Sequence, residues 1–302
     1  MELGFFSPEI SGRDVSEVFA RARAYGFTEV QYDFLTSHRE EMPAAFWADE
    51  LQNIAAAAKE QGIRITAVNG TFNMVDSDTD RLAEYTRRFR LICEAAAYLN
   101  APIVTLCTGS KSPLGMWRYS PDTAREEVFD ELLRTTEKIM PYASEYGLIF
   151  GVETEASNVI FTAERCRRYL DTVGDPRLKV IMDCANLFPA GMARRENVDR
   201  TICNAFELLG KDIVLTHGKD VAESKSAEST AEGGSALSRT AFTDGKPAFA
   251  SPGKGIVNYE LFFELLKEIH YDGGLILHGI HDPADFEPCV EIIRGKMIKA
   301  GI

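Results

Sequence analysis

The stretch VFDELLRTTEKIMPYASEYGLIFGVETEAS, residues 128–157, contains one complete structural unit of the chain. Residues 128–146 carry apolar side chains at the spacing of an amphipathic helix. Gly147 follows, a residue suited to the left-handed conformation that ends many helices. The next residues, LIFGV, predict a strand covered on both faces, because they are apolar without clean alternation. This strand ends in two carboxylates, Glu153 and Glu155, where a buried segment should avoid negative charge.

The same order of strand, helix and glycine recurs along the chain, and it is the pattern of parallel βα units. Eight units in 302 residues predict an α/β protein with a (β/α)8 TIM barrel, and a doubly wound open sheet is the alternative. The expected strands are MELGFF (1–6), TEVQYD (28–33), RITAVNG (64–70), PIVTLCTG (102–109), LIFGVETE (148–155), LKVIMDCAN (178–186), IVLTHGKD (213–220) and GGLILHG (273–279). The residues expected to end helices in the left-handed conformation are Gly26, Gly62, Asn100, Gly147, Gly174 and Gly210.

Length and composition indicate a soluble, globular chain. Residues 1–302 are expected to form a single domain, in which the Ser-, Ala- and Gly-rich stretch 221–257 is a long loop after the seventh strand and a candidate lid. No window approaches the roughly 18 uncharged apolar residues of a membrane span, so no membrane partner is expected. The N-terminus MELGFFSPEI lacks the basic and apolar regions of a secretion signal, which predicts a cytoplasmic protein.

The formal net charge of −13 argues against nucleic acid as a partner, because Lys and Arg are dispersed rather than gathered into a basic patch. The six cysteines are scattered without a CxxC spacing, which suits reduced, buried thiols. A homo-oligomer is left open, because barrels of this kind often associate and no exposed apolar seam can be identified from the sequence.

Candidate metal ligands follow four consecutive strands of the predicted barrel. Glu153 ends the fifth strand, Asp183 the sixth, His217 the seventh and His278 the eighth. Catalytic residues of TIM barrels lie at the C-terminal ends of the strands, so these side chains are expected at one face. Oxygen ligands mixed with imidazole predict one divalent ion, with Mn²⁺ preferred and Mg²⁺, Co²⁺ or Zn²⁺ as alternatives.

Other polar residues at the same ends of the strands are suited to bind the hydroxyl groups of a carbohydrate. A further lysine, in the Gly-rich turn SPGKGIV, is expected to contact an anionic group of the substrate. The predicted substrate-binding residues are Asn69, Thr108, Glu155, Asn186, Lys219 and Lys254.

Several stretches resemble the sugar phosphate isomerase/epimerase family of the xylose isomerase-like TIM barrels. They are VNGTFNM (68–74), VTLCTGSKSPLGMWRYSP (104–121), GVETEASNV (151–159), LKVIMDCANLF (178–188), THGKD (216–220) and YDGGLILHG (271–279). The resemblance implies a metal held by Glu153, Asp183 and His217, with His278 in the place of the family's last Glu. Asn186 stands where the family often has a substrate-binding His.

The resemblance implies a metal-dependent isomerase or epimerase of a sugar or sugar phosphate that works through an enediolate. In this mechanism Glu153 is the base, and His278 is either a fourth ligand or the acid that returns the proton. Three alternatives remain. The same site could support a dehydratase or lyase acting on a keto-sugar or keto-inositol, the barrel could bind carbohydrate without catalysis, or it could resemble endonuclease IV, which the five histidines and the acidic charge disfavour.

Overall fold

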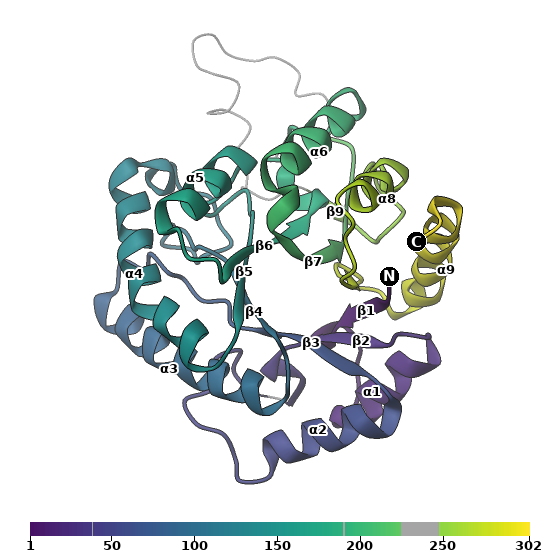
Figure 1. Ribbon diagram of the computed structural model, residues 1–302, viewed down its shortest axis with the longest axis horizontal. Helices are drawn as coiled ribbons and strands as arrows, with labels where there is room; N and C mark the ends of the chain where they lie inside the picture. Colours follow the sequence, from purple (N-terminus) through teal and green to yellow (C-terminus); the bar gives the residue numbers. More distant parts are fainter. Residues whose placement is uncertain (38, 190, 225–247) are drawn as a thin grey trace.

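The computed structural model describes residues 1–37, 39–189, 191–224 and 248–302, and its parallel strands close into a barrel (Figure 1). The first and last barrel strands pair in parallel, with Leu3 opposite Leu275, so the sheet is closed rather than open. The predicted TIM barrel is therefore confirmed, and the open sheet is excluded. In barrel order the strands are β1 (Leu3–Phe6), β10 (Leu275–Leu277), β7 (Ile213–Gly218), β6 (Leu178–Asp183), β5 (Ile149–Glu153), β4 (Ile103–Leu106), β3 (Arg64–Asn69) and β2 (Glu29–Tyr32).

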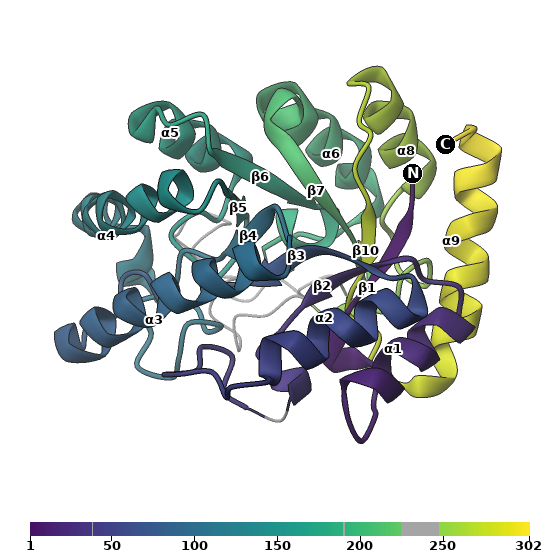
Figure 2. The same ribbon diagram turned by 60° about the horizontal axis from the view of Figure 1, so that its bottom comes forward.

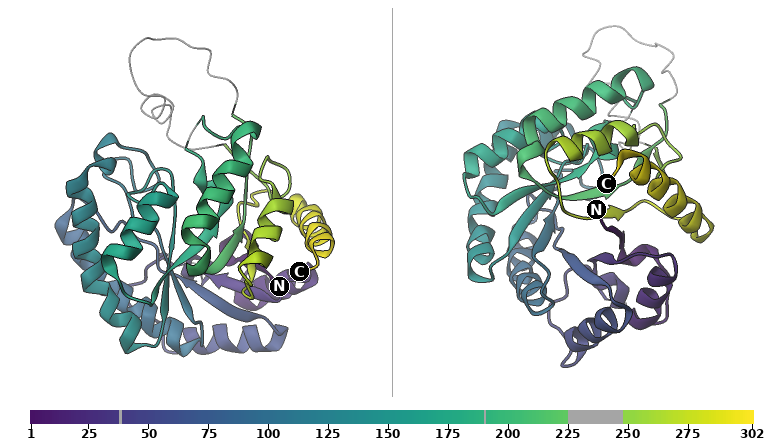
Figure 3. Two further views of the ribbon diagram at one scale, coloured as in Figure 1. Left: turned by 45° about the horizontal axis from the view of Figure 1, so that its top comes forward. Right: turned by 45° about the vertical axis from the view of Figure 1, so that its right-hand side comes forward.

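Helices surround the barrel on its outer side, as Figures 1 and 2 show. The two chain ends lie near each other (Figure 3). The helices are α1 (Val15–Ala24), α2 (Glu50–Gln61), α3 (Thr79–Tyr98), α4 (Glu126–Glu145), α5 (Ala163–Val173), α6 (Arg195–Leu209), α8 (Tyr259–Glu268) and α9 (Phe286–Ala300).

One of the expected left-handed helix ends is wrong. Gly210 has φ −50° and ψ −43°, because the chain continues from α6 directly into a 3₁₀ turn over Gly210–Asp212. The other expected residues, from Gly26 to Gly174, all have positive φ. At Gly62 and Gly174 the helix ends in the left-handed conformation, as the sequence predicts.

The core has two parts. The larger lies between the strands and the helices, where the Phe150 and Phe89 rings meet edge to face at 5.1 Å between centroids. The smaller lies within the barrel, where five strands each contribute one apolar side chain: Ala67, Ile103, Ile181, Leu215 and Ile276. This apolar layer fills the inside of the barrel, and the polar residues of the site follow it toward the C-terminal ends of the strands.

The chain after β7 forms a short antiparallel hairpin of β8 (Asp220–Val221) and β9 (Phe249–Ala250). The Asp220 carboxylate organises the return segment by accepting backbone hydrogen bonds at 2.9–3.0 Å from Val221, Gly253, Gly255 and Val257. Most of the candidate lid, residues 225–247, lies outside the described residues. Within the part of the chain that the structure describes, no helix is long and apolar enough to cross a membrane.

Candidate metal centre

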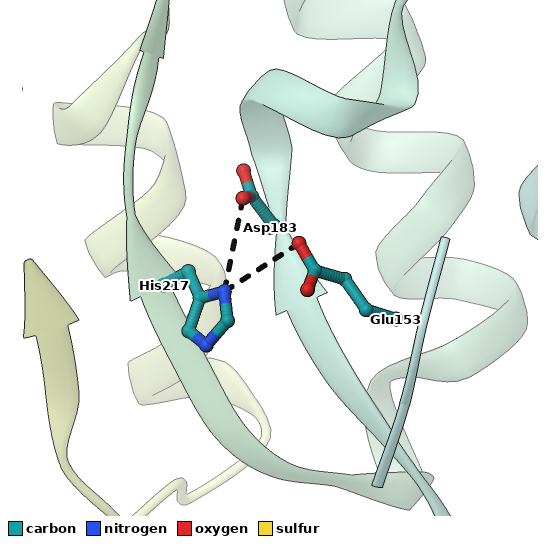
Figure 4. A group of neighbouring side chains, drawn as sticks. All are labelled: Glu153, Asp183 and His217. Atoms are coloured by element: carbon teal, nitrogen blue, oxygen red, sulfur yellow. Dashed lines mark ion pairs between the residues drawn. The ribbon is translucent and has the colours of Figure 1, made fainter. Parts of the chain in front are cut away.

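Three ionisable side chains from adjacent strands converge at the C-terminal end of the barrel (Figure 4). Glu153 ends β5, Asp183 ends β6 and His217 lies opposite Asp183 in the β6–β7 register. One ligand atom from each lies within 4.8 Å of the others, and all three residues are buried. The structure thus brings together three of the four residues predicted to hold a metal.

Two of the facing atoms of this group, one on His217 and one on Asp183, lack hydrogen-bond partners. His217 Nδ1 lies 3.5 Å from Glu153 Oε1 and 3.8 Å from Asp183 Oδ2. Both His217 Nδ1 and Asp183 Oδ2 are buried without a hydrogen bond. Leaving a buried polar atom unpaired costs about 1–3 kcal/mol, and a cation between these atoms would remove that cost. Two carboxylates and an imidazole are also a donor set that divalent ions bind, so the residues fit a metal.

Neighbouring groups fix which atoms point inward. His217 Nε2 lies 2.8 Å from Gln31 Oε1, so Nε2 carries the hydrogen when the amide oxygen accepts, and Nδ1 keeps its lone pair. Asp183 Oδ1 accepts backbone hydrogen bonds from Ala185 at 2.9 Å and Asn186 at 3.3 Å, which leaves Oδ2 free. Such outer contacts orient metal ligands.

The electrostatics of the group require a compensating positive charge. Burial favours the neutral ring of His217, but the carboxylates of Glu153 and Asp183 outweigh it and raise the His217 pKa to about 9. Burial likewise favours the neutral form of Asp183, but Lys219 and His217 hold its pKa well below the usual range. A proton on His217 thus supplies positive charge that a bound cation would otherwise supply.

Lys219 and Asn186 connect the metal ligands to the rest of the site. Lys219 Nζ donates to Asn186 Oδ1 at 3.0 Å, and it lies 3.9 Å from Asp183 Oδ2. Asn186 Nδ2 in turn donates to Glu153 Oε1. The ammonium group also lies over the ring of Phe249, 3.7 Å from its centroid. Lys219 therefore partly neutralises the carboxylates without occupying the space between them.

His278 lies beside this group, and the structure pairs it with a residue that sequence reasoning missed. Its Nδ1 lies 2.7 Å from Glu9 Oε1, and Glu9 also accepts the backbone N–H groups of Gly279 at 2.7 Å and Ile280 at 3.1 Å. Although burial would raise the pKa of Glu9, His278 and these N–H groups lower it, so Glu9 is a carboxylate. Nδ1–H donates to it, and Nε2 is left for the cavity.

The cavity above the ligands has a volume of about 260 Å³. Four of the predicted substrate-binding residues line it, namely Asn69, Glu155, Asn186 and Lys219, together with the catalytic candidates Glu153 and His278. Burial raises the pKa of Glu155 despite the opposing effect of Lys219. The lining therefore combines carboxylates, amides, an ammonium group and an imidazole, which suits a polyhydroxylated ligand.

Thr108 and Lys254 do not lie in this lining. The Thr108 side chain is fully buried, and its hydroxyl accepts a hydrogen bond from the Ile160 backbone at 3.0 Å. Lys254 is exposed and forms an ion pair with Asp285. Thr108 therefore supports the loop after β5, and Lys254 lies outside the cavity because its partner holds it at the surface.

Glu9 and Gln31 are the functional candidates that sequence reasoning missed. Glu9 follows β1 at the same end of the barrel as the predicted ligands. The rule applied to later strands, that polar residues just past a strand face the site, would have found it. Gln31 lies within β2, where a polar side chain in a fully buried strand is itself a signal.

The comparisons with known proteins agree with this architecture. The family model described as xylose isomerase-like TIM barrel matches residues 19–295, so the chain belongs to that family. An inosose dehydratase from Glaesserella parasuis serovar 5 is 24% identical over 173 residues, which are 57% of this chain and 54% of that protein. An inosose dehydratase from Clostridium perfringens is also 24% identical, over 176 residues. The chain spans about half the length of the curated relatives that it matches.

Solved structures share the fold over nearly the full chain. The 3-keto-D-glucoside 4-epimerase of E. coli superposes with a TM-score of 0.70 at 17% identity and covers 98% of this chain and 99% of its own. A D-tagatose 3-epimerase-like protein gives a TM-score of 0.72 at 16% identity, with 100% and 98% covered. The IOLI protein with a bound zinc atom gives 0.69 at 15% identity, with 99% and 98% covered.

Proposed function

We propose that the protein is a divalent-metal-dependent isomerase or epimerase of a sugar or a sugar derivative. The observation that carries this proposal is the buried group of Glu153, Asp183 and His217 beside a polar cavity, in which the unpaired atoms His217 Nδ1 and Asp183 Oδ2 lie 3.8 Å apart. These three residues would hold the ion, and Mn²⁺ is the ion we expect. A bound divalent ion would supply Lewis acidity, which makes the C–H bond beside a substrate carbonyl more acidic.

Glu153 is proposed as the base. Its carboxylate takes the proton from the carbon beside the carbonyl, and the electron pair moves onto the carbonyl oxygen to give an enediolate. Asn186 keeps one carboxylate oxygen oriented through its hydrogen bond to Oε1. The buried Lys219 ammonium group stabilises the negative charge that develops on the substrate oxygens.

His278 is proposed as the acid that returns a proton to the enediolate. β10 is separated from β5 by β7 and β6 in the barrel order, so His278 and Glu153 approach the cavity from different sides. Glu9 accepts the hydrogen on Nδ1, so the proton that returns to carbon is the one that Nε2 carries in the imidazolium form, and the ring is left neutral with its hydrogen on Nδ1. Proton removal by one residue and return by the other inverts the configuration at that carbon.

A dehydratase is the second candidate, supported by the inosose dehydratase relatives and by His278 in place of a carboxylate. In this reaction the enediolate forms as before, but its electron pair expels the hydroxyl group on the next carbon. His278 protonates that hydroxyl, which leaves as water, and the product contains a carbon–carbon double bond. The first step is common to both reactions.

Incubation of the Mn²⁺-loaded protein with ketoses and keto-inositols in deuterated water tests the proposal. Deuterium incorporation beside the carbonyl without loss of water supports the isomerase or epimerase, whereas an unsaturated product supports the dehydratase. Glu153→Gln should abolish both outcomes while the fold is retained, and Glu164→Gln, at the start of the outer helix α5, is the matched control. Absence of exchange across the panel, in protein containing one metal per chain, would favour a carbohydrate-binding barrel.

A further inference from the structure

The cavity of about 260 Å³ that Glu153 and His217 line is called the metal cavity below. A second cavity, of about 510 Å³, borders it and has about twice its volume. Glu41 and Thr71 line both cavities, so the two adjoin at these residues. The second cavity extends between the segment around Glu41, the loop after β3 and the loop after β4. A ligand bound at the metal site can therefore extend into it.

The cations that line the two cavities are already paired with carboxylates. In the second cavity Arg81 binds Asp76 through two nitrogens at 2.6 Å each, and Lys111 pairs with Glu131. In the metal cavity Lys219 lies next to Asp183. Among the described lining residues there is therefore no unpaired Lys or Arg, so the cavities offer little to a phosphate group.

Glu41 lies where the cavities meet, and within the described part of the chain its side chain has no hydrogen bond or ion pair. Burial raises the pKa of its carboxyl group, so the side chain is not freely solvated. A carboxylate in this position can accept hydrogen bonds from two neighbouring hydroxyl groups of a sugar, but it repels a phosphate.

The wall of the second cavity also suits a sugar ring. Phe72 and Tyr85 are stacked, with 6.4 Å between ring centroids and 18° between planes, and both line the cavity. Ser77 and Ser112 supply hydroxyl groups from two different loops. Aromatic surface combined with hydroxyl groups provides apolar contact for the C–H face of a ring and polar contact for its hydroxyls.

We propose that the second cavity binds an additional, uncharged sugar ring, so that the substrate is a glycoside of a keto-sugar rather than a phosphorylated monosaccharide. The inference rests on the proposed function for the reaction at the metal. The metal cavity, at about 260 Å³, is smaller than the roughly 300–1,000 Å³ of pockets for drug-sized ligands, and it accommodates a single ring. The glycosidic oxygen would pass between Glu41 and Thr71.

The test compares a keto-hexose, the same keto-hexose in glycosidic linkage to a second hexose, and a keto-hexose phosphate as substrates of the Mn²⁺-loaded full chain. For wild type, kcat/KM of the two-ring compound should be at least about tenfold higher than that of the single keto-hexose or of its phosphate. A tenfold difference corresponds to about 1.4 kcal/mol. Ser77 is exposed and lines only the second cavity, so Ser77→Trp should fill that cavity and remove the preference. Ser77→Ala, which leaves the cavity open, is the control and should keep the preference.

Binding of unreactive glycosides that lack the keto group, measured by calorimetry, separates this inference from the proposed reaction. Suppose that no compound is turned over, but the two-ring glycoside binds at least about tenfold more tightly than the one-ring glycoside and Ser77→Trp removes the difference. The proposal of a second sugar site is then supported, and the proposed reaction is refuted. If single-ring ketoses react but neither kcat/KM nor binding favours two rings, the reaction stands and the second site is refuted. A preference for the phosphate would also refute it.

Discussion

Addition of Mn²⁺ to the metal-free protein should release about one proton per ion at pH 7. The proton comes from His217, because the metal would bind Nδ1, the atom that carries the extra proton in the imidazolium form. Asp183 contributes no proton, since Lys219 and His217 keep it ionised despite its burial. A bound ion would thus replace the proton that balances the two carboxylates.

The magnitude follows from the His217 pKa of about 9. At pH 7, two units lower, about 99% of the rings carry the proton, so nearly one proton leaves with each ion bound. Between pH 7 and pH 9 the apparent metal affinity should rise about 50-fold, nearly tenfold over the first unit and about fivefold over the second, because half of the rings are already neutral at pH 9. At pH 10 the release should fall to about 0.1 proton, because most rings are already neutral.

Titration calorimetry in buffers with different heats of ionisation measures this release at pH 7, 8 and 10. His217→Gln should bind Mn²⁺ weakly, with little proton release, whereas a matched change of an outlying histidine, His270→Gln, should leave the release near one proton. A release below about 0.3 proton at pH 7 in wild type would refute the reasoning. It would mean that His217 is already neutral, or that Nδ1 does not bind the ion.

Other predictions concern stability and the residues around the site. The raised pKa of His217 contributes on the order of 3 kcal/mol to the free energy of unfolding of the metal-free protein. This contribution is fully present below about pH 6.5 and is lost as the pH rises through about 9. Urea unfolding at several pH values measures it. Gln31→Ala should weaken Mn²⁺ binding about 10–100-fold in calorimetry, because Nε2–H of His217 loses its acceptor. Glu9→Gln should lower kcat about 100-fold or more with little change in KM, and it should alter the pH profile of kcat. If Glu9 and His278 act as a unit, the double variant with His278→Gln should have nearly the same kcat in steady-state kinetics as the single variants. Phe150→Ala should reduce the free energy of unfolding by about 3–5 kcal/mol in urea titrations, because the fully buried ring leaves a cavity against Phe89.

The fold could be predicted from the sequence because its signals are local. A buried parallel strand, an amphipathic helix and a left-handed residue follow one another within about 30 residues, as in 128–157, and each can be recognised without its partners. Gly210 shows the limit of this reasoning. Its local pattern resembles the other helix ends, but the chain continues into a 3₁₀ turn instead of reversing there.

The metal group could also be predicted, since the barrel fixes which ends of the strands meet. The contacts around it could not, because they join residues far apart in the chain. Gln31 and His217 are 186 positions apart, and Glu9 and His278 are 269 apart, so no spacing in the sequence relates them. The role assigned to Thr108 rests on its place after a strand, whereas its hydroxyl is turned toward the Ile160 backbone.

The pair of His278 and Glu9 offers a physical account of how this chain departs from the pattern that it resembles. A neutral imidazole beside a carboxylate has the same net charge as the single glutamate that the family pattern has in the place of His278. The net charge of the site is therefore kept. The negative charge, however, is held on Glu9, where two backbone N–H groups and the ring share it. The cavity is then lined at this place by a ring nitrogen instead of an anionic oxygen. We therefore expect His278 to transfer protons rather than to bind the metal, and we propose that Glu153, Asp183 and His217 hold the ion.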